Sequence, residues 1–474
     1  MENRYKKLLS NSFLFMVAQF GSKVLMLVVV PLYTYLLTTS EYGAIELSTT
    51  TLTIAAPCCM LLIYDAVLRF SMSPDISKTS VMTSSIKVFF LGSLLAIFII
   101  PTCNCISSLK PYSILVYLLV LAYGLFYIFS QFAKGIDVKV FVFSGIIYTT
   151  IFLGCNVLLI VHFRLAVTGY ILSQIIGYAL SSIYCFLRLK VWKYIDFTIN
   201  TKAVTKQMLS YSILLIPNAL VWWVIASANR YFIEGLLGVD SNGIYGIAAK
   251  IPNVITMIGT IFIQAWQLSA IDEKESNTDL VSRRRFFTGV FDTYASVLIL
   301  GSSVLIIFSR LLLTRILSSS FQDAWRFVPF LLLSSIYMMY AQFWSSLFVA
   351  EKSSKELSSS SIISGVLSLV LNWILIPIWG LTAAALVCFI SCFVMWIIRM
   401  ISAKKYNLIN VKYLRESIAL FILLIQCVLV MRFSDIMYSY IVDAILFLFL
   451  VFIYRKPIFT IGNMVMKLLL HAKG

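Results

Sequence analysis

The sequence predicts an all-α, polytopic membrane protein with about 14 transmembrane helices. Of its 474 residues, 61% are hydrophobic and only 12% are charged, whereas soluble domains average about 45–50% and about 25%. Apolar runs of around 20 residues recur along the chain, which is the length that a helix needs to cross the ~30 Å hydrocarbon core. The runs are continuous and do not alternate with polar residues, so they indicate helices rather than barrel strands.

The apolar runs give the spans in chain order, and the basic residues give their orientation. The first run follows the basic segment MENRYKK and is too long for a cleaved signal peptide, so we expect it to be retained. About 28 of the 37 Lys and Arg residues lie on the side of the two termini, against about 6 on the other side. This asymmetry predicts that both termini are cytoplasmic. The predicted spans are 11–37, 43–68, 86–106, 112–133, 141–163, 167–187, 210–237, 244–270, 286–308, 327–350, 360–377, 381–398, 417–431 and 436–454.

The domain organisation follows from the longest loop on the basic side, which falls between the sixth and seventh spans. We expect this loop to link two halves of six helices each, with two further helices after the second half. The net charge of +17 sits in short loops, where it indicates orientation rather than nucleic-acid binding. The expected parts are an N-terminal bundle over 1–187, a linker over 188–209, a C-terminal bundle over 210–402, two additional helices over 403–454 and a basic tail over 455–474.

An internal repeat marks the entry into the second helix of each half. The segments LLTTSEYGAIELSTTTLTI, from Leu36, and LLGVDSNGIYGIAAKIPNVI, from Leu236, keep a constant spacing of 200 residues that aligns Gly43 with Gly243. Polar residues then follow at helical spacing: Glu46, Thr50, Thr53 and Pro57 in the first copy, and Gly246, Lys250, Asn253, Thr256, Thr260 and Gln264 in the second. Such faces are costly against lipid, so we expect them to line another helix or water, as in transporters that rock two bundles around a central site.

Three cations lie within the predicted spans. Lys23, one turn beyond Gln19, is near the middle of the first span. Its alternatives are ligand binding or a buried ion pair with Glu46, Asp65 or Asp292. Arg230 and Lys250 each lie about seven residues, or ~10 Å, from the turn between their spans, so they either bind an anion or snorkel to the interface. Arg230 also has Glu234 one turn away, and the two can neutralise each other.

Further charged residues lie at the ends of the spans or inside them. Arg69 and Lys87 flank the cytoplasmic mouth, as orientation residues or as first contacts for an anion. The intramembrane acids are candidates for carrying a proton or Na⁺, with ion pairing as the alternative: Asp65, Glu234, Asp292 and Asp443. Two histidines and scattered cysteines predict no metal site, and without a GxxxxGK[ST] motif we expect neither ATP hydrolysis nor a cofactor.

The chain resembles the Wzx-type polysaccharide repeat-unit flippases, which form the bacterial polysaccharide transport family within the MATE-like superfamily. The resemblance runs over the full length, although Thr382 stands where the family commonly has glycine. It rests on GSKVLMLVVVPLYTYLLTTSEYG, on NRYFIEGLLGVDSNGIYGIAAKIPN, on DAWRFVPFLLLSS at 323–335 and on LNWILIPIWGLTAAALVCFISC at 371–392.

The resemblance implies two pseudo-symmetric six-helix bundles in a V around a central cavity, plus two C-terminal helices, in the bacterial inner membrane. It implies a cargo, an undecaprenyl-pyrophosphate-linked oligosaccharide repeat unit of O-antigen, lipopolysaccharide or a similar surface polysaccharide. This cargo would move from the inner to the outer leaflet by alternating access. The implied partners are the lipid bilayer and, beyond it, a polysaccharide polymerase and a chain-length regulator.

Such a cargo needs cations for its pyrophosphate and polar groups for its sugars. The expected substrate-binding residues are Lys23, Arg230, Lys250, Gln19, Asn253, Gln264 and Arg69, and the expected coupling-ion residues are Asp65, Glu234 and Asp292. A lipid II flippase would share these features, and a MATE-type multidrug exporter would favour an acidic cavity. A membrane polysaccharide polymerase or glycosyltransferase would carry a large outer loop, whereas the longest outer segment, 309–326, is short. We therefore expect a transporter without catalytic residues.

Overall fold

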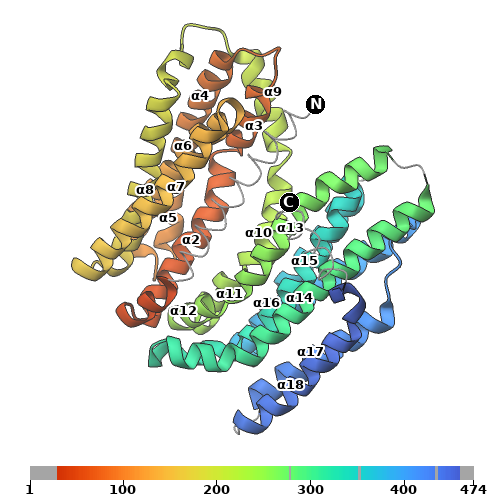
Figure 1. Ribbon diagram of the computed structural model, residues 1–474. Coiled ribbons are helices and arrows are strands. Elements are labelled where there is room, and N and C mark those ends of the chain that lie inside the picture. The colour runs from red at the N-terminus through yellow and green to blue at the C-terminus, as the bar shows by residue number, and fades with distance from the viewer. Residues whose placement is uncertain (1–28, 277–278, 351–353, 433–435, 460–474) are drawn as a thin grey trace, which may run out of the picture. The chain divides into compact units, whose positions relative to one another are not determined.

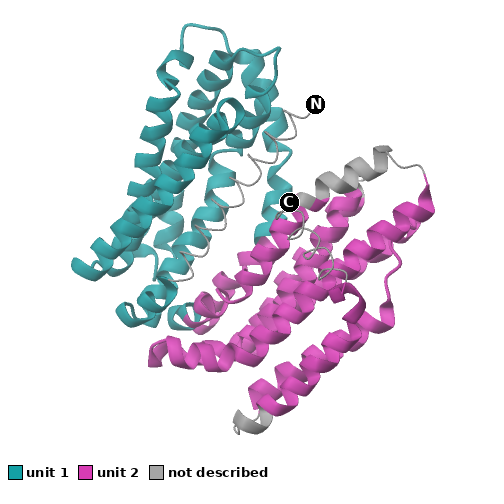
Figure 2. Ribbon diagram, in the orientation of Figure 1, with its two compact units in different colours: residues 1–223, 238–243 teal, residues 224–237, 244–474 magenta. Residues whose placement is uncertain are grey.

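The computed structural model describes residues 29–276, 279–350, 354–432 and 436–459, and within them every regular element is a helix (Figure 1). The chain divides into two compact units, shown in teal and magenta in Figure 2. Unit 1 comprises residues 1–223 and 238–243, and unit 2 comprises residues 224–237 and 244–474. The predicted all-α class is thereby confirmed, while the predicted domain boundaries stay predictions.

Unit 1 is a helical bundle built from the N-terminal part of the chain. The boundary between the units falls inside two helices, α10 (Ile216–Ser227) and α12 (Val239–Ala248), which begin in unit 1 and end in unit 2. The other elements of unit 1 are a helical segment over residues 29–36, α2 (Thr39–Cys59), α3 (Ile63–Ser71), α4 (Lys78–Ala96), α5 (Ile99–Asn104), η1 (Lys110–Tyr112), α6 (Ser113–Ile136), α7 (Val138–Asn156), the π-helical η2 (Val157–His162), α8 (Ala166–Arg188), η3 (Val191–Tyr194) and α9 (Lys202–Ile213).

Unit 2 is a second helical bundle, in which α15 packs against α13, α14 and α16 and the pair α17–α18 packs on α14. Its elements, besides the ends of α10 and α12, are α11 (Asn229–Leu237), α13 (Pro252–Ser276), α14 (Leu280–Ile316), η4 (Ser319–Arg326), α15 (Val328–Ala350), α16 (Ser354–Ala403), η5 (Lys404–Tyr406), α17 (Tyr413–Arg432) and α18 (Ile436–Ile453).

Eight helices in the described ranges are long and apolar enough to cross a membrane, and the number rises to 11 if each of three bent helix pairs counts as one span. This count takes Glu356–Tyr406 as one helix, and most of the first predicted span lies outside the described residues, so the predicted number of about 14 is not confirmed. Long exposed apolar faces, such as Phe90, Leu94 and Phe98 on α4 and its continuation, fit contact with lipid rather than water.

The long element α16 is two antiparallel arms rather than one rod. The backbone reverses at Gly380, whose φ of +59° and ψ of −139° lie outside the helical region and suit glycine. Arg399 on the second arm reaches back to the first, where its Nε and Nη2 donate hydrogen bonds to Ser360 Oγ (2.9 Å) and Ser361 Oγ (2.8 Å). The reversal agrees with the two spans predicted at 360–377 and 381–398.

The second helix of each half is broken, which corrects the continuous spans predicted at 43–68 and 244–270. The axes of α2 and α3 differ by 60°, and those of α12 and α13 differ by 49°. Leu61 and Leu62 take left-handed φ values near +50° at the first break. At the second break, Pro252 has no N–H group to continue the helical hydrogen bonds. The break therefore follows from proline chemistry in the second half and from an irregular turn in the first.

Candidate functional site

The two copies of the sequence repeat meet in unit 1, where the first turns of α2 and α12 cross. A Cβ atom added to Gly43 would lie 2.1 Å from the carbonyl oxygen of Val239, and one added to Gly243 would lie 2.0 Å from that of Thr39. The two contacts are reciprocal, because each glycine faces the residue four positions before the other glycine. The two glycines that the sequence repeat aligns thus make equivalent close contacts at the starts of two helices.

The local sequence explains why both helices start at this crossing. Thr38 caps α2 through its side chain, which accepts a hydrogen bond from the N–H of Glu41, and Glu41 accepts one from the N–H of Thr38 (2.8 Å). This reciprocal capping box satisfies two N–H groups that a helix start would leave unbonded. On the other side, Gly238 precedes α12 with φ +86°, a conformation that suits glycine.

Polar side chains hold the crossing together. Thr39 Oγ1 donates a hydrogen bond of 2.5 Å to Asp240 Oδ1, and Asn242 Nδ2 donates one of 3.2 Å to the carbonyl oxygen of Gly43. Asn242 is fully buried. The crossing therefore combines close backbone approach with directional bonds, and it fixes the entry points of both broken helices.

The polar stripes that follow the two helix starts lie in different surroundings. Glu46 and Thr50 of the first copy are 5% and 4% exposed, so this stripe packs inside unit 1. In the second copy, Asn253 and Gln264 are exposed on α13 of unit 2. Thr260 between them donates a 2.6 Å bond to the carbonyl oxygen of Thr256. The first stripe therefore packs against other helices, as one form of the expectation had it, and that the second lines water stays a prediction.

Asp65, a predicted coupling-ion residue, lies beside a cluster of buried tyrosines in unit 1. The rings of Tyr64 and Tyr127 are 5.6 Å apart, and both tyrosines lie close enough to Asp65 to interact with its charge. Glu46 adjoins the same cluster through Tyr42. The sequence analysis missed this cluster, although Tyr123 and Tyr127 stand four residues apart. Its members are Tyr33, Tyr42, Tyr64, Tyr123, Tyr127, Tyr148, Tyr170 and Tyr178.

The two cations predicted at the cytoplasmic mouth, Arg69 and Lys87, both turn towards the region of α9. The guanidinium group of Arg69 lies 4.6 Å from the ring centroid of Tyr211, a cation–π contact. Lys87 Nζ donates a 3.0 Å hydrogen bond to Thr201 Oγ1. Thr205 Oγ1, one turn into α9, donates to Ser84 Oγ at 2.9 Å. These bonds attach the start of α9 to α4.

A basic groove of about 990 Å³ runs along α9. Lys202 and Lys206 are exposed on one part of its wall, and Ile213 and Leu214 are exposed on another. A groove that combines ammonium groups with aliphatic surface fits an amphiphile with an anionic head. We name it the α9 groove; its lining residues are Lys87, Ile199, Asn200, Thr201, Lys202, Thr205, Lys206, Leu209, Ser210, Ile213 and Leu214.

The loop that leads into the α9 groove is held by an aspartate turn. Asp196 Oδ1 accepts hydrogen bonds from Thr198 Oγ1 (2.6 Å) and from the N–H of Thr198 (2.9 Å). These bonds, together with the charge of Lys87, lower the pKa of Asp196 below its ordinary value. The N–H of Asp196 also donates to Thr83 Oγ1 at 3.0 Å, which attaches the loop to α4.

Arg230 and Glu234 lie one turn apart on α11 in unit 2, as the sequence predicted. Arg230 lies near Tyr245 and Cys388, and Asn229 Nδ2 donates to Tyr245 Oη at 2.6 Å and to Cys388 Sγ at 3.4 Å. Both Arg230 and Glu234 take part in further polar interactions. The segment thus forms a polar cluster that joins α11, α12 and the second arm of α16.

Lys250 stands at the break between α12 and α13 rather than on a continuous helical face. Its N–H donates to the carbonyl oxygen of Ile247 at 3.0 Å, a turn rather than an α-helical bond, and its side chain is half-buried. The prediction that Lys250 shares a helical face with Asn253 is therefore wrong, because a 49° bend between α12 and α13 separates the two residues. Lys23 and Gln19, the other two predicted substrate-binding residues, lie outside the described residues.

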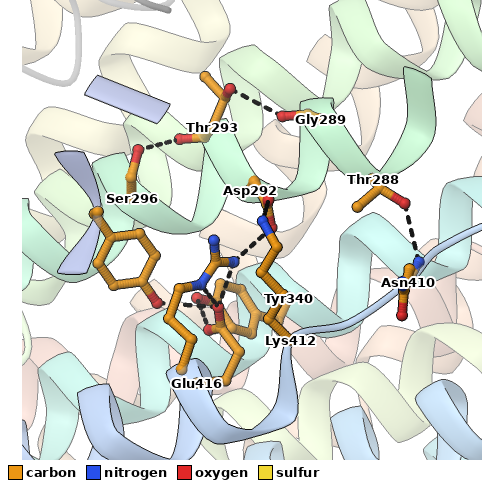
Figure 3. A network of polar contacts seen from close by, with 11 residues as sticks. Thr288, Gly289, Asp292, Thr293, Ser296, Tyr340, Asn410, Lys412 and Glu416 are labelled. Atoms are coloured by element: carbon orange, nitrogen blue, oxygen red, sulfur yellow. Dashed lines mark hydrogen bonds and ion pairs between the residues drawn. The ribbon is translucent and has the colours of Figure 1, made fainter. Parts of the chain in front are cut away.

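Asp292, the third predicted coupling acid, is engaged in ion pairs (Figure 3). Its Oδ2 lies 2.6 Å from Lys412 Nζ and its Oδ1 lies 2.5 Å from Arg415 Nη2. Asp292 is on α14, whereas Lys412 and Arg415 are at the start of α17. The ion-pair alternative therefore holds for Asp292, with partners that the sequence analysis did not identify.

The same network encloses Glu416, a buried carboxylate at the start of α17 (Figure 3). Its Oε1 accepts hydrogen bonds from Arg415 Nη2 (2.8 Å) and Tyr454 Oη (3.0 Å), and its Oε2 accepts one from Tyr340 Oη (3.0 Å). Three helices contribute, α14, α15 and α17, together with Tyr454 just after the end of α18. This saturated network ties the two C-terminal helices to the core of unit 2.

The amino-acid sequence matches one protein-family model. A family model described as "Polysaccharide biosynthesis protein" matches residues 8–267, which is more than half of the chain. No curated protein sequence matches at a significant level.

Three solved structures illustrate the fold. The lipid II flippase MurJ, in an inward closed conformation, superposes with a TM-score of 0.66 at 13% identity and covers 94% of this chain and 100% of its own. An inward-facing multidrug resistance MATE family transporter of the MOP superfamily gives 0.62 at 12% identity, with coverage of 81% and 94%. A MOP superfamily transporter from Pyrococcus furiosus gives 0.52 at 10% identity, with coverage of 84% and 95%. At these identities the likeness establishes the fold alone.

Proposed function

The chain belongs to the polysaccharide biosynthesis protein family, and from that premise we propose that it is a flippase for lipid-linked oligosaccharides. The family match over more than half of the chain is the observation that carries the proposal. The fold adds support, since it is similar to that of a lipid II flippase over 94% of this chain. A transporter role also accounts for an all-helical chain with a repeated, broken second helix.

In finer detail, the cargo is an undecaprenyl-pyrophosphate-linked repeat unit of O-antigen or a similar surface polysaccharide. It moves from the inner to the outer leaflet of the bacterial cytoplasmic membrane by alternating access, with both protein termini cytoplasmic. A polysaccharide polymerase and its chain-length regulator would then act on the flipped unit. The excess of Lys and Arg in the loops on the side of the termini supports this orientation, because basic loops face the cytoplasm. Arg69 and the α9 groove lie on that side.

The α9 groove supplies chemistry for the first step. The pyrophosphate carries negative charge, and Lys87, Lys202 and Lys206 offer ammonium groups to it. Ile213 and Leu214 offer aliphatic surface on which a polyprenyl chain can lie. An anionic lipid head would therefore gather at this groove before it enters the protein.

The sugars need hydrogen-bonding groups that replace water. The exposed face of α13 offers the amide side chains of Asn253 and Gln264, each of which both donates and accepts. Arg230, Lys250 and Lys23 are proposed to compensate the pyrophosphate during passage. Glu234 and Asp65 stay proposed coupling-ion residues, whereas Asp292 is proposed to be structural because Lys412 and Arg415 already pair with it.

Lipid II is the second candidate cargo, since the structure with a TM-score of 0.66 is a lipid II flippase. Both cargoes share a polyprenyl pyrophosphate and differ in the glycan. The experiment is to delete the gene and to recover lipid-linked glycans from inside-out and right-side-out vesicles with a membrane-impermeant lectin. We expect intact repeat units to accumulate on the cytoplasmic face. Unpolymerised units on the outer face would instead identify a polymerase, and accumulation of lipid II would identify the other cargo.

A further inference from the structure

The helix α18 buries one acidic side chain where it packs against α14 and α17 in unit 2. Asp443, Leu450 and Tyr454 share the inward face of α18 and its end, and all three are fully buried. Ile441, Ile445 and Leu448 are exposed on the opposite face. Asp443 lies about seven residues, or ~10 Å, along α18 from its start at Ile436, well inside the apolar length of the helix.

The two buried carboxylates of the C-terminal helix pair differ sharply in their surroundings. Glu416 accepts hydrogen bonds from Arg415, Tyr340 and Tyr454. Neither carboxylate oxygen of Asp443 has a hydrogen-bond or ion-pair partner within the part of the chain that the structure describes. One acid is thus fully compensated as a carboxylate, and the other is not.

The groups that surround Asp443 supply no positive charge to it. On α17, Cys427 lies next to it, and Gln426 Nε2 donates to its backbone carbonyl oxygen at 3.3 Å rather than to its carboxylate. On its own helix, Tyr440 lies within electrostatic reach of both Asp443 and Arg310 of α14. The guanidinium group of Arg310 itself lies 5.0 Å from the ring centroid of Trp325.

An ionised carboxylate without partners is strongly disfavoured in a dry membrane interior, so the side chain must be neutralised. A metal cation such as Na⁺ would need several further oxygen ligands. In the described residues no group of three or more His, Cys, Asp or Glu side chains surrounds it, and Gln426 Oε1 already accepts a 2.9 Å bond from Ser303 Oγ. A proton needs no other ligand, so it is the ion that fits this site.

We propose that Asp443 is a proton-binding site of the C-terminal helix pair, loaded while α18 packs against α14 and α17. Release of the proton would leave a bare charge in this packing, so release requires α18 to separate from its neighbours or water to enter. A proton bound and released in the membrane can couple transport to a proton gradient, and only this use rests on the proposed flippase function.

The test uses dicyclohexylcarbodiimide on the purified full chain in lipid nanodiscs. This reagent adds as a whole to a protonated carboxyl group through its O–H bond, and the adduct rearranges to a stable N-acylurea that mass spectrometry locates. At neutral pH we expect Asp443 to be labelled about tenfold or more above Glu416, which accepts three hydrogen bonds as a carboxylate. Protection by Na⁺ at constant pH would overturn the assignment to a proton.

Infrared spectroscopy decides the case where the reagent does not reach the site. The spectrum of the wild type minus that of Asp443→Asn should show the carbonyl band of a protonated carboxyl group at neutral pH. A carboxylate band in its place would overturn the proposal. Both measurements need only the folded protein, so their failure is distinct from a failure to flip lipid-linked glycans.

Discussion

Gly43 and Gly243 occupy equivalent places on the two sides of one helix crossing, 200 residues apart in the chain. Each faces the backbone of the other copy, at Val239 and Thr39 respectively, with no room for a Cβ atom. Two residues that the sequence repeat aligns therefore have equivalent contacts in the structure. It also places the starts of both broken helices, α2 and α12, at a single close contact.

Alanine at either glycine should destabilise the protein. A methyl group at 2.0–2.1 Å from a carbonyl oxygen forces the two backbones apart, and overpacking of this kind costs about 1–3 kcal/mol. We expect Gly43→Ala and Gly243→Ala each to lower the thermal unfolding midpoint of the purified protein in detergent.

The matched control is Gly145→Ala on α7, where an added Cβ would meet nothing within 4 Å. Alanine there should stabilise the helix by about 0.5–1 kcal/mol, because glycine is the poorer helix former. Equal effects of all three substitutions would contradict the close crossing.

The network around Asp292 predicts a large effect of Arg415→Met on stability. The substitution leaves Asp292 with Lys412 alone and takes the cation from Glu416, which is buried. Removal of one partner from a buried pair costs about 3–5 kcal/mol. Denaturant unfolding in detergent measures this loss.

The comparison for Arg415 is Arg326→Gln, which breaks an exposed pair. Arg326 Nε lies 3.3 Å from Asp323 Oδ1, and both side chains are more than half exposed. Exposed pairs contribute about 0–1 kcal/mol, so this variant should unfold close to the wild type. A similar small loss for Arg415→Met would show that the network is not buried in the membrane protein.

The α9 groove predicts weaker capture of anionic polyprenyl lipids when its lysines are neutralised. Each lysine near an anionic head contributes about 1 kcal/mol, so Lys202→Gln and Lys206→Gln should each weaken binding about fivefold. The measurement is the binding of undecaprenyl pyrophosphate to the protein in neutral-lipid nanodiscs. Lys139 is exposed at the start of α7 and does not line the groove, so Lys139→Gln should bind as the wild type does.

The Asp196 turn predicts a pH limit for the order of the loop before α9. Its pKa is lowered in the folded state, so its contribution to stability is present above the unfolded value of about 3.9 and is lost as the pH falls through the lowered value. Hydrogen exchange of residues 196–201 should therefore be unaffected by acidification to about pH 5, after correction for intrinsic rates.

The corresponding variant, Asp196→Ala, removes the turn at neutral pH. We expect faster hydrogen exchange at Thr198, whose N–H then has no carboxylate to bond. Asp75→Ala, in the exposed loop between α3 and α4, serves as the comparison and should leave residues 196–201 unchanged. Unaltered exchange in Asp196→Ala would show that the hydrogen bonds of Asp196 do not hold the loop before α9.

Hydropathy and glycine chemistry made most of the fold accessible from the sequence. The reversal at Gly380 lies between the two spans predicted at 360–377 and 381–398 from their apolar length. The repeat gave the pair Gly43 and Gly243, because equivalent close contacts demand the same small residue. The break near Lys250 was missed, since an apolar run does not record where Pro252 ends the helical bonding.

Long-range partners were beyond such patterns. Asp292 pairs with Lys412 and Arg415, more than 100 residues later, and nothing in the local sequence marks that pairing. Arg399 was counted with the loop cations, yet it is fully buried, with Nη1 donating to the carbonyl oxygen of Ala341 at 2.8 Å. Charge alone shows that a residue is costly to bury, but only the packing shows whether its partners exist.

The central claim is tested most directly by reconstitution of the purified protein in liposomes that carry a fluorescent undecaprenyl-pyrophosphate oligosaccharide. A membrane-impermeant glycosidase, added outside, reports which glycans face outwards. The account predicts that protein-containing liposomes lose nearly all of the glycan signal, whereas protein-free liposomes retain the roughly half that faces inwards. Retention of that inner half in the presence of correctly folded protein would contradict a flippase.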